Sequence, residues 1–283
     1  MTFFRAKWIL LSLLIISTIY LWLVILEKTN DSLLRVSFLD IGQGDSIFIE
    51  APNGNQVLID GGANRQVLQQ LAKQMPFYDR SLDLVIATHS DLDHIGGLPF
   101  VFDRYKVAGF MEPGVRANTS ADIALILKAK KAKNYILARR GMRVVLEPDI
   151  YFDILFPDRD PVGMETNTAS VVGRLTYGET SFLLTGDSPS EIETYLVNLD
   201  AESLSADVLK AGHHGSKTST SDRFVAVVNP ELAIISAGRD NRYGHPHQVV
   251  LDTLARYGVS VLNTANQGVI NLLSDGRQIV VEN

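Results

Sequence analysis

Along most of this chain, hydrophobic residues occur in short runs that turn-forming residues separate. From Leu34 onward the runs LLRVSFLDIG, SIFIEAP and QVLIDGG predict three strands, because each is a short apolar segment bounded by turn residues. Asn53-Gly54, between the last two runs, is a strong signal for a tight hairpin turn. The domain is therefore expected to begin with antiparallel strands.

In the rest of the chain, segments with the hydrophobic spacing of helices alternate with short apolar runs typical of strands. Helical spacing predicts helices over residues 66–75, 123–133, 190–199, 224–228 and 248–256. Further strands are predicted over residues 82–88, 142–146, 151–156, 170–177, 180–184, 206–210 and 232–236, with two more at the C-terminus. Periodicity alone supports a mixed α/β fold. Two strand-rich halves that each carry helices favour a four-layer αβ/βα sandwich.

The N-terminal apolar run is different, because it extends without a charge from Trp8 to Leu26. A run of this length approaches the about 20 residues that cross a bilayer core. Basic residues precede it and acidic residues follow it, which predicts an N-terminus in the cytoplasm and a chain that continues outward. The flanking charges are those of Arg5, Lys7, Glu27 and Asp31.

We therefore expect a single-pass anchor in the cell membrane over residues 1–30 and an extracytoplasmic domain over residues 31–283. The alternatives are a cleaved signal peptide and a buried core helix. A signal peptide would need a small-residue cleavage site after the apolar run, and none is present. A buried core helix would not explain the Trp and Tyr residues near the ends of the run.

Composition limits the chemistry that this domain can perform. The chain has 283 residues and is 46% hydrophobic, which is enough for one α/β domain with a full core. A formal net charge of −6 argues against a protein that coats nucleic acid through bulk electrostatics. The chain has no cysteine, which excludes disulfides, thiolate metal ligands and a cysteine nucleophile.

The densest polar cluster follows the predicted strand over residues 82–88. His89, Asp91, Asp93 and His94 lie within the sequence HSDLDH, and Gly96-Gly97 follow. Histidine and aspartate are suitable ligands for zinc or manganese, and a loop at a strand end can direct alternate side chains to one point. The alternative is a surface loop in which an aspartate only caps the next helix. Four potential ligands in six residues favour a metal site.

Other polar residues also stand where apolar strands end. Asp60 follows QVLI, Asp187 ends LLTGD, and His213-His214 follow the strand of VLKAGHHGS. His247, in YGHPH, either contacts substrate or only holds a loop.

These motifs resemble the metallo-β-lactamase superfamily, whose signature is H-x-(His, Asp or Glu)-x-D-H. More narrowly, VSFLDIGQGDSIFIEAP, THSDLDHIGG, NTASVV, LLTGD, KAGHHGS and YGHPH resemble, in matching order over residues 34–275, the hydrolase domain of the ComEC-type DNA-internalisation (competence) family. They also resemble phosphorylcholine esterases built on the same fold. The resemblance implies a metallo-β-lactamase-like sandwich over residues 31–283. The multi-helix channel of full ComEC proteins is not in this sequence, so DNA transport by this chain alone is not expected.

The resemblance also implies a set of metal ligands for one or two divalent ions, either Mn²⁺ or Zn²⁺. His89, Asp91 and Asp187 would hold one ion, while Asp93, His94, Asp187 and His214 or His213 would hold the other, with His214 favoured. Asp60 would orient the site from outside the ligand set. Asn167 and Ser170 stand where many members place a further histidine, so one ion would have fewer ligands. The early loop residue Asp45 would either line the site or be an ordinary polar residue of the loop with no role at the site.

The expected reaction is hydrolysis of a phosphodiester, DNA or another, by metal-bound hydroxide. Its expected catalytic residues are Asp93, Asp187 and His247, with His247 assisting the leaving oxygen. The alternative is a noncatalytic module tethered to the membrane, which binds a polyanion or assists a DNA-uptake machine.

Overall fold

The computed structural model describes residues 2–29 and 33–282, and the side chains of residues 7–22 within the first helix. The chain divides into two compact units, residues 1–33 and residues 34–283. The first unit consists of helix α1 (Thr2–Thr29).

The predicted membrane anchor is not supported by the structure. Within residues 2–29 and 33–282, no helix is long and apolar enough to cross a membrane.

The second unit contains a first sheet of eight strands, with the order β15-β14-β1-β2-β3-β4-β5-β6. Its first half is antiparallel, and the strands from β3 to β6 are parallel. The predicted hairpin at Asn53-Gly54 joins β2 to β3. The bounds are β1 Leu34–Phe38, β2 Ile47–Glu50, β3 Gln56–Ile59, β4 Ser81–Ile86, β5 Lys106–Glu112, β6 Asn134–Leu137, β14 Ile270–Ser274 and β15 Ile279–Glu282.

The second sheet has seven strands, with the order β13-β12-β11-β10-β9-β8-β7. It mirrors the first, because β10 to β13 are parallel and β7 to β10 are antiparallel. The bounds are β7 Arg143–Glu147, β8 Ile150–Phe156, β9 Val172–Tyr177, β10 Thr180–Leu184, β11 Val208–Lys210, β12 Leu232–Ile235 and β13 Ser260–Asn263.

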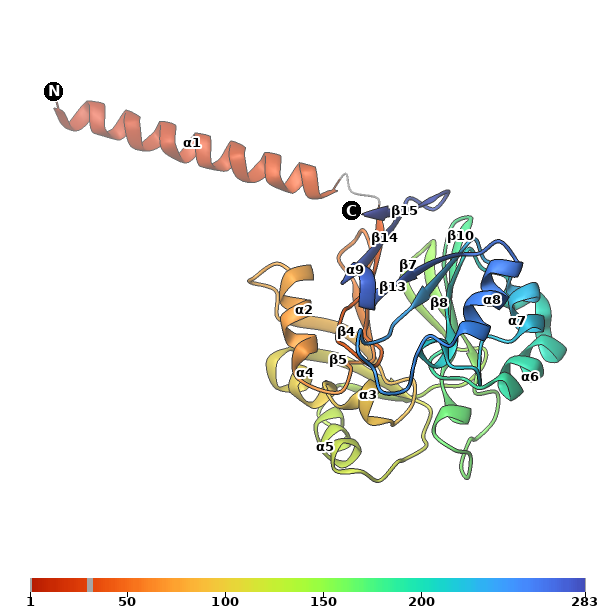
Figure 1. Ribbon diagram of the computed structural model, residues 1–283. Coiled ribbons are helices and arrows are strands. Elements are labelled where there is room, and N and C mark those ends of the chain that lie inside the picture. Colours follow the sequence, from red (N-terminus) through yellow and green to blue (C-terminus); the bar gives the residue numbers. More distant parts are fainter. Residues whose placement is uncertain (1, 30–32, 283) are drawn as a thin grey trace. The chain divides into compact units, whose positions relative to one another are not determined.

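Helices cover the outer face of each sheet (Figure 1). Those on the first sheet are α2 Gln66–Gln74, α3 Leu92–Ile95, α4 Leu98–Arg104 and α5 Ser120–Ala129. Those on the second sheet are α6 Ser190–Asp200, α7 Asp222–Val228 and α8 Gln248–Arg256, and the short α9 (Thr264–Gln267) follows β13. Short 3₁₀ turns occupy Asn167–Ala169, Ala201–Leu204 and Gly212–Gly215.

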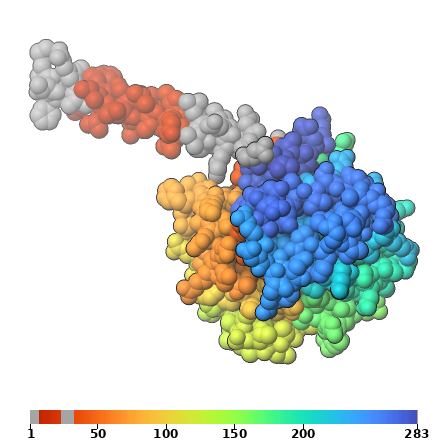
Figure 2. Space-filling view, in the orientation of Figure 1, coloured from red at the N-terminus to blue at the C-terminus, as the bar shows by residue number. Residues whose placement is uncertain are grey.

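Apolar cores separate these layers, and a small further cluster of Ala211, Ile235 and Ala237 lies at the second sheet. One lies between the sheets, and one lies under the helices of each sheet. Strand β4 shows how one strand contributes to two cores, since Ile86 packs between the sheets while Val85 packs under the helices. A continuous apolar run is what a strand covered on both faces requires. The unit is thus an α/β sandwich with two mixed sheets, and its C-terminal part (blue) lies beside the first half (orange) on the face in Figure 2.

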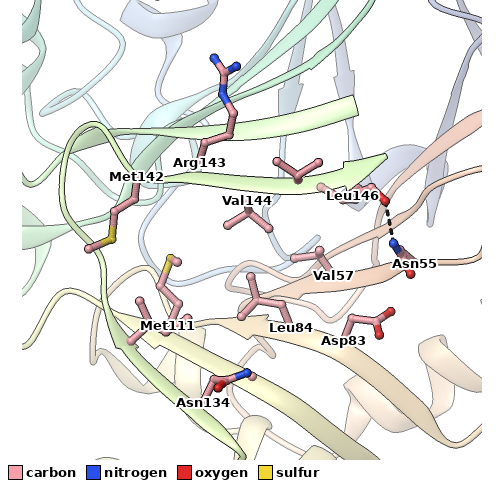
Figure 3. A pocket seen from close by; sticks show the side chains of 13 residues that line it. Asn55, Val57, Asp83, Leu84, Met111, Asn134, Met142, Arg143, Val144 and Leu146 are labelled. Carbon is pink, nitrogen blue, oxygen red and sulfur yellow. Dashed lines mark hydrogen bonds between the residues drawn. The ribbon is translucent and has the colours of Figure 1, made fainter. Parts of the chain in front are cut away.

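Where the edge strands β6 and β7 face each other, the sheets leave a cavity of about 490 Å³. Figure 3 shows Met111, Leu84 and Val57 of the first sheet turned toward Met142 and Val144 at β7. The Asn55 Nδ2 donates to the Leu146 carbonyl across one end, at 2.6 Å. The lining is mainly apolar and contains none of the predicted ligands, so the metal chemistry lies elsewhere.

Candidate metal centre

The predicted ligands come from both sheets, at the ends where the parallel strands finish. Strand β4 leads into His89 and then into α3, which carries Asp93 and His94. Strand β10 leads to Asp187, and β11 leads to the turn that carries His214. Carboxyl ends of parallel strands meet at one edge of a sheet, and the loops there form the binding sites of open α/β sheets. Residues far apart in the sequence are brought together here.

Four of these residues converge on one point. The Asp187 Oδ2 lies 3.2 Å from His94 Nε2 and 3.3 Å from His214 Nε2. The Asp93 Oδ2 lies 3.4 Å from the same His214 nitrogen. Ligands at the zinc distances of about 2.0–2.2 Å, arranged tetrahedrally, would stand about 3.3–3.5 Å apart. The Asp187, His94 and His214 side chains therefore fit one divalent ion, and Asp93 lies beside His214 as a candidate fourth ligand.

The orientation of the two imidazoles fits the same ion. The His94 Nδ1 lies 2.7 Å from Asp60 Oδ2, and the His214 Nδ1 lies 2.9 Å from the Ser236 carbonyl. A ring that donates from Nδ1 directs its Nε2 lone pair away from that partner. Both Nε2 atoms are buried and, within the described residues, have no hydrogen-bond partner. Unpartnered buried nitrogens that point at a carboxylate are what a metal would satisfy.

Asp60 is fixed in turn by the strand that precedes the cluster. Its Oδ1 accepts from the Thr88 backbone N–H at 2.8 Å, and its Oδ2 accepts from the Thr88 hydroxyl at 2.6 Å. Asp60 is fully buried, and burial raises its pKa. Asp60 therefore lies behind His94, on the side of the ring away from Nε2.

Asp45 is also close to the ligands, since donor atoms of Asp45, His94, Asp187 and His214 all lie within 4.8 Å of one another. However, Asp45 faces the Nδ1 side of both rings, at 3.9 Å from His94 and 3.3 Å from His214. The metal-facing nitrogens are on the opposite side. Asp93 is therefore placed to act as a ligand from the Nε2 side, whereas Asp45 is placed to support His214.

Lys210 is the residue at this site that the sequence reasoning missed. Its side chain is fully buried, and its ammonium forms an ion pair with the Asp45 carboxylate. The Lys210 Nζ also lies 3.1 Å from the Gly186 carbonyl and 3.6 Å from Asp187 Oδ1. Burial works against its charge, but the Asp45 and Asp187 carboxylates raise its pKa. The available signal was a lysine that ends the apolar strand VLK, since lysines are rarely fully buried unless paired.

A second position for an ion has fewer ligands. The His89 Nε2 is buried without a partner among the described residues and lies 3.9 Å from Asp91 Oδ2. The Thr166 hydroxyl donates to the other Asp91 oxygen at 2.6 Å, and the adjacent Asn167 has a buried, unpartnered Oδ1. The Ser170 hydroxyl accepts from the backbone N–H of Asp187 at 3.3 Å.

His213 and His247 lie at the margin of the centre. The His213 Nε2 is 3.9 Å from Asp187 Oδ2, and its side chain is partly exposed. The His247 Nδ1 accepts from the Lys217 backbone N–H at 3.2 Å, at the start of α8. A pocket of about 210 Å³ opens over the ligands, and His245 lines it where the sequence led us to expect His247. The other lining residues are Gln43, Asp91, Asp93, Asp187, His213, His214 and Tyr243.

The pKa values of the buried aspartate and histidine side chains are shifted in different directions. Burial opposes the charge of Asp187, but the neighbouring His214 and His94 hold its pKa well below the usual value. The same contacts with Asp187 raise the pKa of His94 and of His214. Burial and the nearby His94 lower the pKa of His89 to about 3, so its ring is neutral at pH 7 and can donate a lone pair.

Metal binding is therefore expected to strengthen as pH rises. In the metal-free protein, the raised pKa values of His94 and His214 keep these rings protonated at neutral pH. Each proton must leave before Nε2 binds an ion, so acid favours the free protein and alkali favours the complex. Calorimetric titration with Mn²⁺ in two buffers of different ionisation enthalpy should show proton release. Proton uptake, or an affinity that does not change with pH, would contradict this.

Gly44 is expected to be required for the position of Asp93. A Cβ at Gly44 would lie 2.0 Å from the Asp93 carbonyl oxygen, and its φ is +120°. Gly42 has a φ of +77° and open space, so it is a matched control for backbone strain alone. Gly44→Ala should lose bound metal as well as stability, while Gly42→Ala should lose only about 1 kcal/mol. Equal metal content in the two variants would contradict the prediction.

The family model of the metallo-beta-lactamase superfamily matches residues 39–239, and the chain belongs to this superfamily. Among curated proteins, the chain is 36% identical over 253 residues to ComE operon protein 3 of Bacillus subtilis, covering 83% of this chain and 32% of that protein. It is 32% identical to Recombination protein 2 of Haemophilus influenzae, covering 88% of this chain and 30% of that protein. These relatives confirm the resemblance to the ComEC-type family. The chain spans about a third of their length.

The likeness to solved structures concerns the fold. The metallo-beta-lactamase fold protein YhfI of Bacillus subtilis superposes with a TM-score of 0.58 at 14% identity, covering 85% of this chain and all of that one. The family and the cluster of histidine and aspartate define a metallo-hydrolase fold with a site suited to a divalent metal.

Proposed function

We propose that this protein is a metal-dependent phosphodiesterase that acts on DNA or another phosphodiester. The observation that carries the proposal is the convergence of two carboxylates and two unpartnered imidazole nitrogens at 3.2–3.4 Å. A set this rich in oxygen suits Mn²⁺ as well as Zn²⁺. A divalent ion in this position acts as a Lewis acid and makes a nucleophile available from water at neutral pH.

The chain's own residues would divide the remaining work. Asp93, His94, Asp187 and His214 would hold the ion, and Asp60 would keep a proton on His94 Nδ1 once Nε2 has lost its own proton to bind the ion. His89 and Asp91 would hold a second ion more weakly. The pocket admits the substrate beside His245, which is partly buried and whose Nδ1 has no described hydrogen-bond partner. We therefore propose that His245 contacts the phosphodiester, in place of His247.

Two observations favour a phosphodiester over a β-lactam. Asp91 and Asn167 stand where many superfamily members place histidines, so the His-rich zinc set is absent from the motif positions. In addition, two relatives carry names that connect them to competence or recombination, namely Competence protein ComA of Neisseria gonorrhoeae and Recombination protein 2. We extend that connection to this chain as part of the proposal.

The test is hydrolysis of bis-p-nitrophenyl phosphate and of linear DNA by the full chain, stripped of metal and reloaded with Mn²⁺ or Zn²⁺. We expect turnover that requires metal and disappears in Asp93→Asn. A protein that binds metal stoichiometrically but turns over neither substrate would contradict the proposal and favour a noncatalytic binding module.

The extracytoplasmic position stays a prediction from the charges that flank the N-terminal apolar run. A reporter that is active only outside the cytoplasm, fused after residue 40, should be active. An inactive fusion with normal expression would contradict that position.

A further inference from the structure

One wall of the metal pocket is aromatic and is not used by the ligand set. Tyr243 and His245 line the pocket together with Asp93, Asp187 and His214. They belong to the loop between β12 and α8. Tyr243 is 49% exposed, so core packing does not explain its ring at this position.

Hydrogen bonds hold this loop in place. The Asn241 Oδ1 accepts from the His245 backbone N–H at 2.9 Å, while its Nδ2 donates to the carbonyls of Gly238 and His245 at 2.8 and 2.6 Å. The Gln43 Oε1 accepts from the Gly238 N–H at 3.2 Å, which ties the loop to the opposite wall of the pocket. The aromatic wall is therefore positioned before any substrate arrives.

The side chains on this wall form a stack. The Tyr243 and His245 rings lie 5.6 Å apart at an interplanar angle of 21°. The guanidinium carbon of Arg242 is 4.9 Å from the centre of the Tyr243 ring, and its Nη2 donates to the Tyr243 hydroxyl at 2.8 Å. His245 continues the row toward His213, at 5.7 Å between ring centres. The Tyr243–His245 stack thus extends from the exposed Tyr243 ring toward His213, whose ring meets that of His245 edge-on at an interplanar angle of 72°.

We propose that Tyr243, supported by Arg242 and His245, is a stacking subsite for the planar base of a nucleotide whose phosphodiester lies at the metal centre. This inference rests on the proposed phosphodiesterase function and names its substrate class. Bases stack on exposed aromatic rings and on arginine, and the arginine charge also complements phosphate.

The position of Arg242 decides between two kinds of diester. A quaternary ammonium group such as choline also binds to aromatic faces. Here, however, the ring already carries a guanidinium, whose charge would repel a second cation. A neutral base attached to an anionic phosphate meets no such repulsion, so the subsite favours a nucleotide diester over a phosphorylcholine diester.

The experiment compares two substrates with one leaving group, thymidine 5′-(p-nitrophenyl phosphate) and p-nitrophenylphosphorylcholine, on the metal-loaded full chain. Wild type should prefer the nucleotide. Tyr243→Leu should raise the KM for the nucleotide about 10-fold, with kcat and the choline substrate unchanged. Tyr243→Phe keeps the ring but loses the hydroxyl that accepts from Arg242, so its KM for the nucleotide should rise by less than that of Tyr243→Leu.

The outcomes separate the subsite from the proposed function. Equal effects of Tyr243→Leu on both substrates, or a wild-type preference for the choline diester, would overturn the subsite but leave the phosphodiesterase intact. If neither substrate is hydrolysed, the proposed function fails, and calorimetric binding of thymidine 5′-monophosphate decides the subsite. Binding weakened about 10-fold in Tyr243→Leu but not in Tyr243→Phe would support it, and equal or absent binding in all three proteins would overturn it.

Discussion

Asp93→Asn is expected to remove the bound metal and the activity while leaving the fold in place. The Asp93 carboxylate is about one-third exposed, so the isosteric change creates no cavity. It removes one anionic ligand, 3.4 Å from His214 Nε2. Changing a residue that only orients a ligand costs about 10–100-fold in metal affinity, and losing a ligand should cost more. Turnover should fall by at least the same factor.

The stability of the protein gives a second readout for the same variant. Ligand binding stabilises the folded state, by about 2.7 kcal/mol when the free ligand is at 100 times its Kd. Wild type should therefore melt at a higher temperature when Mn²⁺ or Zn²⁺ is added, whereas Asp93→Asn should not respond. Metal content by elemental analysis checks this directly.

Asp103→Asn is the matched control, because Asp103 is an exposed carboxylate on α4 that pairs with Lys128 away from the pocket. It should keep the metal and the activity. His94→Ala should also lose the metal. However, it removes the histidine partner of the buried Asp60 carboxylate, so a loss of metal in this variant could also reflect a less stable fold. Full metal content in Asp93→Asn would remove this residue from the ligand set.

Lys210→Met is expected to destabilise the metal-free protein by up to about 3–5 kcal/mol, because the buried Asp45 carboxylate loses its ion-pair partner and keeps only the more distant His214 and His94 rings. Lys210 is fully buried, and Asp45, its ion-pair partner, is also buried. Methionine is of similar length and apolar, so the loss is mainly one of charge. Urea denaturation in the presence of EDTA measures the free energy of unfolding without the contribution of metal.

Two further variants make the result specific. Lys210→Met combined with Asp45→Asn removes both charges, so it should recover much of the lost stability. Lys128→Met breaks a surface pair with Asp103 and should cost no more than about 1 kcal/mol. If Lys210→Met is as mild as Lys128→Met, the buried pair does not hold the two sheets together at this site.

Local signals made several elements predictable. The Asn53-Gly54 turn sets a hairpin within a few residues, and helix α8 has the predicted bounds of residues 248–256. The missed elements have conflicting local signals. Strand β5 contains Gly109, which is unfavourable in strands, yet β4 and β6 pair with it on both sides. Helix α4 follows Gly96-Gly97 and has Pro99 in its first turn, which disguised its helical spacing, whereas a helical turn at His94 was expected.

Gly96 and Gly97 are required by tertiary contacts. A Cβ at Gly96 would lie 2.2 Å from the Ala63 carbonyl oxygen, and one at Gly97 would lie 2.0 Å from that of Gly61. The loop after β3 therefore packs directly against the helix that carries His94. The sequence shows two glycines, but only the folded chain shows what approaches them.

The sequence by itself predicted the candidate ligands, because His89 to His94 lie on one short segment and the other candidates each follow an apolar strand. Residues at strand ends gather at one edge of a sheet whatever the details of packing. Only the tertiary structure decided how the two sheets meet. The pairing of Lys210 with Asp45, and the presence of His245 rather than His247 in the pocket, depend on contacts between segments far apart in the chain. Such contacts leave no local pattern, because their energy comes from burial and charge that exist only after folding.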